Sequence, residues 1–133
     1  MITHALTAIL VGTQAVPAPP VEHEIMIIGG RLRNWRGRVR QAGHGQLRCV
    51  TDRSSTDVDV DRIGCDALVT CMTQMQPRWR AMSDRALDRR TRRSMREALE
   101  RDLGRCVTEG RNQLVEELAE RRFRAREAGR NDD

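Results

Sequence analysis

Apolar positions in the first half of the chain follow patterns that are typical of β-strands. Residues 24–28, EIMII, form a continuous apolar and β-branched run followed by two glycines, which predicts a short buried strand ending at a turn. The segments 36–40 and 46–50 flank the loop QAGHG, whose two glycines favour a hairpin connection. Together these segments predict a small antiparallel sheet over residues 24–50.

Alternation along the predicted hairpin separates two kinds of side chain. If Arg40 faces Gln46, then Val39 faces Leu47, and the apolar side chains share one face. The other face then carries four arginines: Arg36, Arg38, Arg40 and Arg48. Like charges across a strand pair destabilise it slightly, so this face favours a covering anion, although a solvated face screened by salt accounts for it equally.

Further along the chain, apolar residues recur every three or four positions rather than every second position. Residues 62–76 predict a helix that Pro77 ends, with Asp59 or Asp61 as its cap. Its apolar stripe consists of Cys65, Leu68, Val69, Met72 and Met75.

The region 77–128 is rich in arginine, glutamate, leucine and alanine and predicts helical structure. Its apolar stripe advances by fours and eights, so a straight helix cannot bury it on one side, and we expect a bend or break near Gly104 or Gly110. Residues 88–94 contain no large apolar side chain and predict an exposed turn on which four arginines align: Arg85, Arg89, Arg92 and Arg96. We expect the tail, 129–133, to fray.

These elements predict an α+β fold. A small sheet and a disulfide-tied helix occupy residues 24–76, and a long, bent, charged helical region follows over 77–128.

The N-terminus resembles a secretory leader. Residues 1–15 carry no charged side chain and contain an apolar run from Ala5 to Gly12, although no basic residue precedes it. Residues 16–23 contain three prolines and predict an extended linker. The apolar run is too short to span a membrane, so we expect a periplasmic or secreted protein, with a cytoplasmic one as the alternative.

Cysteine usage favours the same compartment. The four cysteines form no CxxC or histidine-paired arrangement of the kind that zinc sites use, so we expect two disulfides. If residues 62–76 are helical, Cys65 and Cys71 lie about 9 Å apart along the axis, which is too far for a bond between them. Cys49 therefore pairs with Cys65 or with Cys71, and Cys106 takes the other.

Charge is distributed unevenly. All 24 basic residues are arginine, which indicates first a GC-rich coding sequence and only second selection for guanidinium chemistry. The formal net charge is +5. Residues 31–48 carry six arginines and no acid, and residues 78–96 carry eight arginines against two aspartates. These clusters favour an anionic partner, such as envelope lipid, lipopolysaccharide or another polyanion.

No catalytic motif accompanies these clusters. His44 lies in a plausible loop site without an identifiable nucleophile, and no metal site or cofactor is predicted, so we do not expect an enzyme. An alternative is a protein-interaction module that docks on an envelope protein through its C-terminal helices. Sequence-blind nucleic-acid binding is a further alternative for a cytoplasmic protein, whereas base readout is not expected, because there is no RNP-like aromatic pattern and the chain has only two tryptophans.

One stretch of the chain resembles known proteins. Residues 24–29, EIMIIG, with Arg31-Leu32-Arg33, Cys49 and the segment 63–71, IGCDALVTC, are similar to small uncharacterised exported proteins of Gram-negative bacteria. The opening EIxIIG piece is also similar to the segment that begins the plug of TonB-dependent receptors. The resemblance covers residues 24–75 and implies an envelope location without implying an activity.

Overall fold

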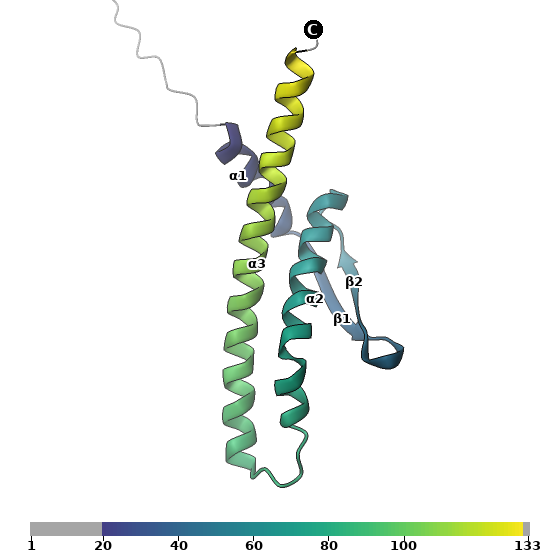
Figure 1. Ribbon diagram of the computed structural model, residues 1–133, viewed down its shortest axis with the longest axis vertical. Coiled ribbons are helices and arrows are strands. Elements are labelled where there is room, and N and C mark those ends of the chain that lie inside the picture. The colour runs from purple at the N-terminus through teal and green to yellow at the C-terminus, as the bar shows by residue number, and fades with distance from the viewer. Residues whose placement is uncertain (1–19, 132–133) are drawn as a thin grey trace, which may run out of the picture.

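The computed structural model describes residues 20–131 and has the predicted α+β architecture. The helices α2 and α3 run antiparallel as a long pair, a two-stranded hairpin packs against α2, and α1 packs against the C-terminal half of α3 (Figure 1). In chain order the elements are α1 (Pro20–Leu32), β1 (Arg36–Gln41), a 3-10 turn (Gly43–Gly45), β2 (Leu47–Arg53), α2 (Val58–Ala81) and α3 (Arg89–Asn131).

The predicted strand over residues 24–28 is wrong, because this segment lies inside α1. Five residues are too few to reveal a helical period, and their β-branched composition favoured a strand. Over the whole helix the buried or half-buried positions recur every three or four residues and face the core, whereas Met26 and Ile27 stay exposed. The core side of α1 comprises Val21, Glu24, Ile25, Ile28 and Leu32.

The prediction of an extended linker over residues 16–23 is wrong for residues 20–23, which are helical. Residues 20–23 form the first turn of α1, where proline is tolerated because the missing N–H needs no helical partner. Residues 16–19 and the predicted leader, 1–15, lie outside the described part of the chain.

The hairpin is present, with a register that differs by two residues from the predicted one. Val39 faces Cys49 rather than Leu47, because Gln46 lies opposite Ala42, two residues beyond Arg40, and its carbonyl accepts from the Ala42 N–H at 2.6 Å. A shift of two keeps every side chain on its face, so the separation into an apolar and an arginine face is retained.

Trp35 joins the hairpin to the helices. It is only 3% exposed, and its indole N–H donates to Thr51 Oγ1 at 3.3 Å. A methyl group added to Gly37 would lie 2.2 Å from the ring, and one added to Gly64 of α2 would lie 2.6 Å from it. The guanidinium of Arg111 on α3 lies over the ring at 5.4 Å from its centroid. Two glycines therefore make the space that this side chain fills.

Helix α2 is longer than the predicted helix at both ends. Asp57 caps its N-terminus by accepting hydrogen bonds from the backbone N–H groups of Asp59 and Val60. The prediction that Pro77 ends the helix is wrong, since α2 continues to Ala81. Proline removes one backbone hydrogen bond, but packing against α3 and an ion pair at 2.8 Å from Arg78 to Asp102 hold the last turn in place.

Helix α3 is continuous from Arg89 to Asn131, so there is no break at Gly104 or Gly110, the expected place of a bend or break. Gly110 lies where α3 approaches α2, and a methyl group there would lie 3.6 Å from the Ala67 methyl, which explains a small residue at this position. The expected fraying of 129–133 is also wrong for 129–131, which complete the helix, and residues 132–133 lie outside the described part.

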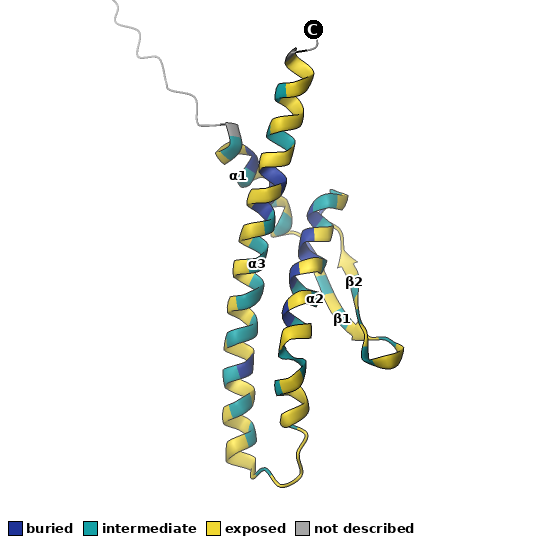
Figure 2. Ribbon diagram, viewed as in Figure 1, coloured by how far each residue is buried: buried dark blue, intermediate teal, exposed yellow. Residues whose placement is uncertain are grey.

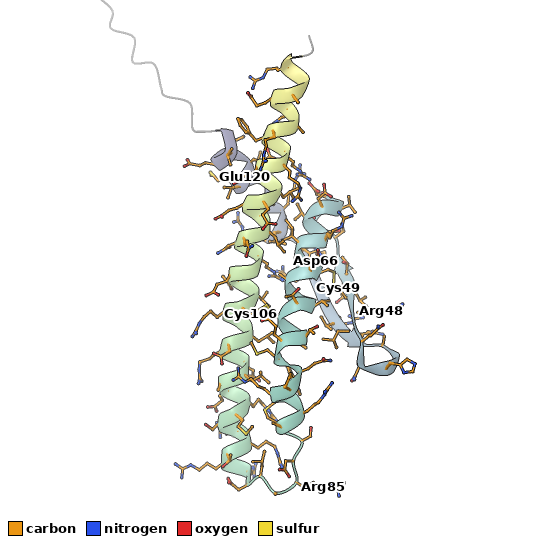
Figure 3. The ribbon with its side chains drawn as sticks, viewed as in Figure 1. Arg48, Cys49, Asp66, Arg85, Cys106 and Glu120 are labelled. Carbon is orange, nitrogen blue, oxygen red and sulfur yellow. A yellow bond between two sulfur atoms is a disulfide. The ribbon has the colours of Figure 1, made fainter. Side chains whose placement is uncertain are left out.

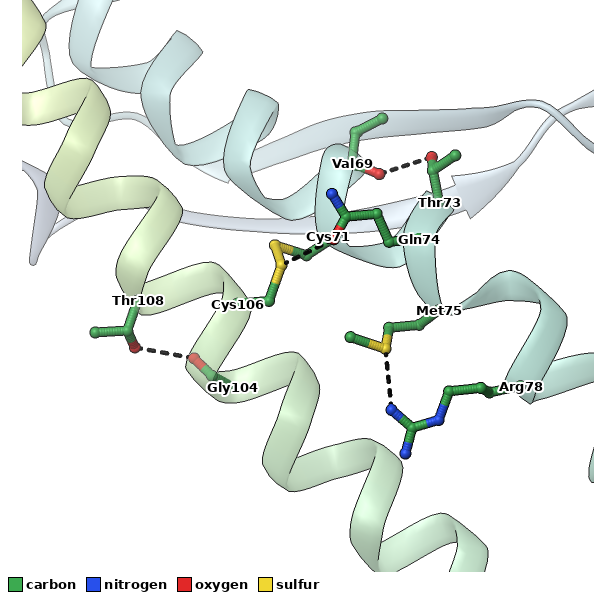
Figure 4. The surroundings of a disulfide bond; sticks show 9 residues. All are labelled: Val69, Cys71, Thr73, Gln74, Met75, Arg78, Gly104, Cys106 and Thr108. Atoms are coloured by element: carbon green, nitrogen blue, oxygen red, sulfur yellow. Dashed lines mark hydrogen bonds between the residues drawn. A yellow bond between two sulfur atoms is a disulfide. The ribbon is translucent and has the colours of Figure 1, made fainter.

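Two disulfides join the elements. Cys49 of β2 bonds Cys65 of α2, and Cys71 of α2 bonds Cys106 of α3, with Cα separations of 5.5 and 5.9 Å (Figures 3 and 4). This is one of the two pairings that helix geometry left open. Disulfides persist in oxidising compartments, so the cross-links indicate an exported protein.

Buried residues concentrate on one side of the second disulfide, where α1, α2 and α3 meet (Figure 2). The distal arm, which we define as residues 72–105, has Leu99 as its single fully buried side chain. The arm is therefore a thin helical hairpin that projects from the core.

Candidate anion-binding surfaces

The end of the distal arm carries the larger basic cluster. We call residues 78–96 the tip, and the loop between α2 and α3 lies at its centre. Asp84 accepts a hydrogen bond from the Ala86 N–H at 2.9 Å, and Asp88 accepts from the N–H and hydroxyl of Thr91 at 2.9 and 2.6 Å. The Thr91 hydroxyl and N–H hold the pKa of Asp88 below its usual value. Both acids of the tip are thus engaged in turn and helix capping rather than in pairing with arginine.

The predicted alignment of four tip arginines holds in part, because Arg92 has another role. Its guanidinium donates to the carbonyl oxygens of Met82, Asp84 and Leu87 at 3.1, 2.9 and 3.2 Å. These bonds fold the loop onto the start of α3. Arg92 is therefore a structural residue of the loop and offers little to a ligand.

The remaining arginines of the tip divide into two that form ion pairs and five whose side chains have no partner in the described part of the chain. Arg93 pairs with Glu97 at 3.0 Å and Arg78 with Asp102, but five exposed arginines make no hydrogen bond or ion pair within residues 20–131: Arg80, Arg85, Arg89, Arg90 and Arg96. Arg89 and Arg96 line a shared hollow of about 490 Å³, into which Glu97 and Glu100 also project. The tip therefore offers several unpaired guanidinium groups over a short span.

The hairpin carries the second predicted cluster, and its arginines differ in what they contact. Arg40 lies directly opposite Arg48, and no acid pairs with either in the described chain. Arg38 instead pairs with Asp52 on the neighbouring strand at 2.5 Å. Arg36 donates to the carbonyl oxygens of residues 33 and 35 at 2.7 and 2.8 Å. Two of the four predicted arginines therefore remain unpaired.

The two clusters lie on different elements. Arg48 is on β2 beside the middle of α2, whereas Arg85 is in the loop at the far end of the helical pair (Figure 3). They are two separate surfaces rather than one continuous patch.

A third set of charged groups, which the sequence reasoning missed, lies at the opposite end of the helical pair. Arg122 of α3 contacts Asp57 at 2.9 Å, Asp59 at 3.2 Å and the buried carboxylate of Glu24 at 3.8 Å. Arg126 contacts Glu24 as well, at 2.8 Å. The hydrogen bond from Arg122 holds the pKa of Asp57 far below its usual value, against the opposing effect of burial. Arg31 of α1 also contacts Asp57, at 2.6 Å, so three arginines oppose three carboxylates where α1, α2 and α3 meet.

Arg111 is the other partly buried arginine. Burial and the nearby charge of Arg36 lower its pKa, and its Nε is buried without a hydrogen-bond acceptor. Its ring contact with Trp35 accounts for its position. We assign it a packing role.

No family model, curated protein or solved structure matches this chain. Its own side chains therefore carry any functional inference. All four cysteines are bonded, so no thiol is free to act with His44 as a nucleophile. Within residues 20–131 there is no group of histidine, cysteine or acidic side chains that would hold a metal ion, and no helix that is long and apolar enough to cross a membrane.

Proposed function

We propose that this chain is a non-enzymatic, exported binding protein that presents arginines to an anionic partner of the cell envelope. Phosphate-bearing lipid, lipopolysaccharide and other polyanions share the oxyanion chemistry that the guanidinium fork binds. The observation that carries the proposal is the tip, where five exposed arginines lack partners while both aspartates cap backbone N–H groups.

The position of these arginines on α3 strengthens the proposal. Arg89 and Arg90 begin the helix, and its first turn contains no acidic residue. A helix N-terminus carries partial positive charge, so each cation there is unfavourable by about 0.3–1 kcal/mol. The Asp88 cap already offsets part of this penalty, and an anion bound beside the guanidinium groups offsets more of it.

Two observations support export to the periplasm or cell exterior. Two disulfides join the described elements, and the uncharged apolar run of residues 1–15 is similar to a leader. A cross-linked arm with a charged end suits contact with a surface.

A matched pair of variants tests the proposal. R85Q/R89Q/R96Q removes three charges from the tip, and R101Q/R105Q/R121Q removes three exposed charges elsewhere on α3. We expect the tip variant to bind heparin and anionic vesicles about tenfold or more weakly, since each lost phosphate contact weakens binding, whereas the control changes much less. Binding that weakens equally in both variants, or that is insensitive to salt, would contradict the proposal.

The second candidate is a protein-interaction module that uses the C-terminal helices. A groove of about 760 Å³ follows α2 and α3 beside the second disulfide, and its lining includes the apolar side chains Ala67, Met75 and Leu114. Light scattering on the purified protein tests self-association through this groove. A monodisperse monomer at every concentration, unchanged by M75E, would count against that form of the interaction.

A further inference from the structure

Ion pairing with a soluble polyanion does not account for the exposed tryptophan of the tip. The chain contains two tryptophans, of which Trp35 is buried and Trp79 is 45% exposed near the C-terminus of α2. Tryptophan is a large apolar side chain with a single polar N–H, and burying it is favourable. An exposed one beside a cluster of arginines therefore indicates a partner with both apolar and anionic parts.

Hollows on both sides of Trp79 continue this surface. A groove of about 310 Å³ separates α2 from the hairpin, and Trp79 lines it together with Val39, Leu47 and Met72. The single charged residue that lines this groove is Arg80. Apolar side chains and one unpaired cation thus adjoin the indole on the hairpin side.

On its other side, Trp79 shares a hollow of about 380 Å³ with arginines of α3. Arg96 and the buried Leu99 line this hollow, together with the loop-binding Arg92 and the acid Glu100. Arg96 also lines the neighbouring hollow that contains Arg89. The indole is therefore continuous with Arg96 and, through the neighbouring hollow, with Arg89.

This combination matches the chemistry of a lipid bilayer surface. Tryptophan concentrates where lipid headgroups meet acyl chains, because its ring prefers the apolar side and its N–H prefers the wet side. Arginine contacts phosphates while its aliphatic stem lies along apolar surface, and basic clusters are attracted to anionic leaflets. Neither property requires a membrane-spanning helix.

We propose that the tip docks on an anionic lipid bilayer, with Trp79 at the boundary between headgroups and acyl chains and with Arg85, Arg89 and Arg96 against lipid phosphates. This inference rests on the proposed anion binding and names a membrane surface as the partner. It assigns the indole a function that a soluble polyanion does not provide.

Tryptophan emission tests the inference directly, because Trp35 is buried and Trp79 is the exposed reporter. We add vesicles of phosphatidylcholine, with or without phosphatidylglycerol, or heparin. The anionic vesicles should shift the emission to shorter wavelength, and lipids brominated on their acyl chains should quench it. Heparin should bind without either change, and W79F should abolish the shift.

Two variants test whether Trp79 contributes to affinity. W79S should weaken binding to anionic vesicles by about fivefold or more while leaving heparin binding nearly unchanged. M26S is the matched control, because Met26 is an exposed apolar residue of α1, away from the tip, and its loss should leave vesicle binding unchanged.

Two outcomes separate the inference from the function on which it rests. Salt-sensitive binding to vesicles and heparin with unchanged Trp79 emission would overturn membrane docking and leave anion binding standing. Binding to neither probe would overturn the proposed anion binding itself.

Discussion

The contact between Trp35 and Gly64 allows a sharp test of the packing. Gly64→Ala would place a methyl group 2.6 Å from the indole ring, which is closer than any ordinary carbon contact. The ring is buried and cannot move aside without disturbing the hairpin. Gly104→Ala is the matched control, because Gly104 also lies inside a helix but has no heavy atom near the position of the new methyl group.

Both substitutions gain helix propensity, which is about 1 kcal/mol for glycine to alanine in a helix interior. Gly64→Ala alone also introduces overpacking, which destabilises a well-packed core by about 1–3 kcal/mol. The propensity gain cancels in the comparison, so the free energies of unfolding of the two variants should differ by about 1–3 kcal/mol, with Gly104→Ala the more stable.

Urea unfolding of the oxidised proteins, followed by far-ultraviolet circular dichroism, measures the two free energies. Equal stabilisation by both substitutions would refute the reasoning, since it would mean that the indole moves freely and does not fix the hairpin on α2.

Three further changes have defined outcomes. C71S/C106S should lower the free energy of unfolding by about 4 kcal/mol in the chain-entropy view, because the bridge closes a sequence separation of 35 residues. Arg122 lowers the pKa of Asp57 in the folded state, so the ionised Asp57 stabilises the fold above its unfolded pKa of about 3.9. This stabilisation is lost as the pH falls below that value. D57N should therefore make the stability less dependent on pH in the acid range. R92M should destabilise by about 1–3 kcal/mol through loss of its loop carbonyl contacts.

Each of these outcomes has a measurement that can contradict it. Denaturant midpoints of the oxidised and bridge-free proteins should differ, and coincident curves would exclude stabilisation by the bridge. Stability measured from pH 6 to pH 2 should fall less steeply in D57N than in the parent, and parallel curves would exclude the coupling. R90M is the control for R92M, since Arg90 has no hydrogen bond in the described chain, and equal losses would show that the loop contacts contribute nothing.

The features predictable from sequence were those fixed by local geometry. The separation of faces on the hairpin followed from strand alternation and survived a two-residue error in register, because an even shift leaves each side chain on its face. The rise of a helix excluded a bond between Cys65 and Cys71, and the structure has one of the remaining pairings.

The features that could not be predicted depend on contacts between distant elements. The segment 24–28 is helical because α1 buries one side against α2 and α3, and its composition alone favours a strand. Arg92 was placed among the binding arginines because the loop conformation that directs carbonyl groups at it is not visible in sequence. Arg122 contacts acids more than sixty residues away, which no local pattern reveals.

The disulfide between Cys71 and Cys106 closes the distal arm into a covalent ring. Opening that begins at the loop therefore gains limited chain entropy, because Cys71 and Cys106 stay joined while the segment between them unfolds. The arm has one fully buried residue, so its amide hydrogens should exchange with solvent at a lower opening free energy than those of the core. We therefore expect the disulfide to separate two regions of different local stability. The charged end of the arm can open while the hairpin and α1 stay folded.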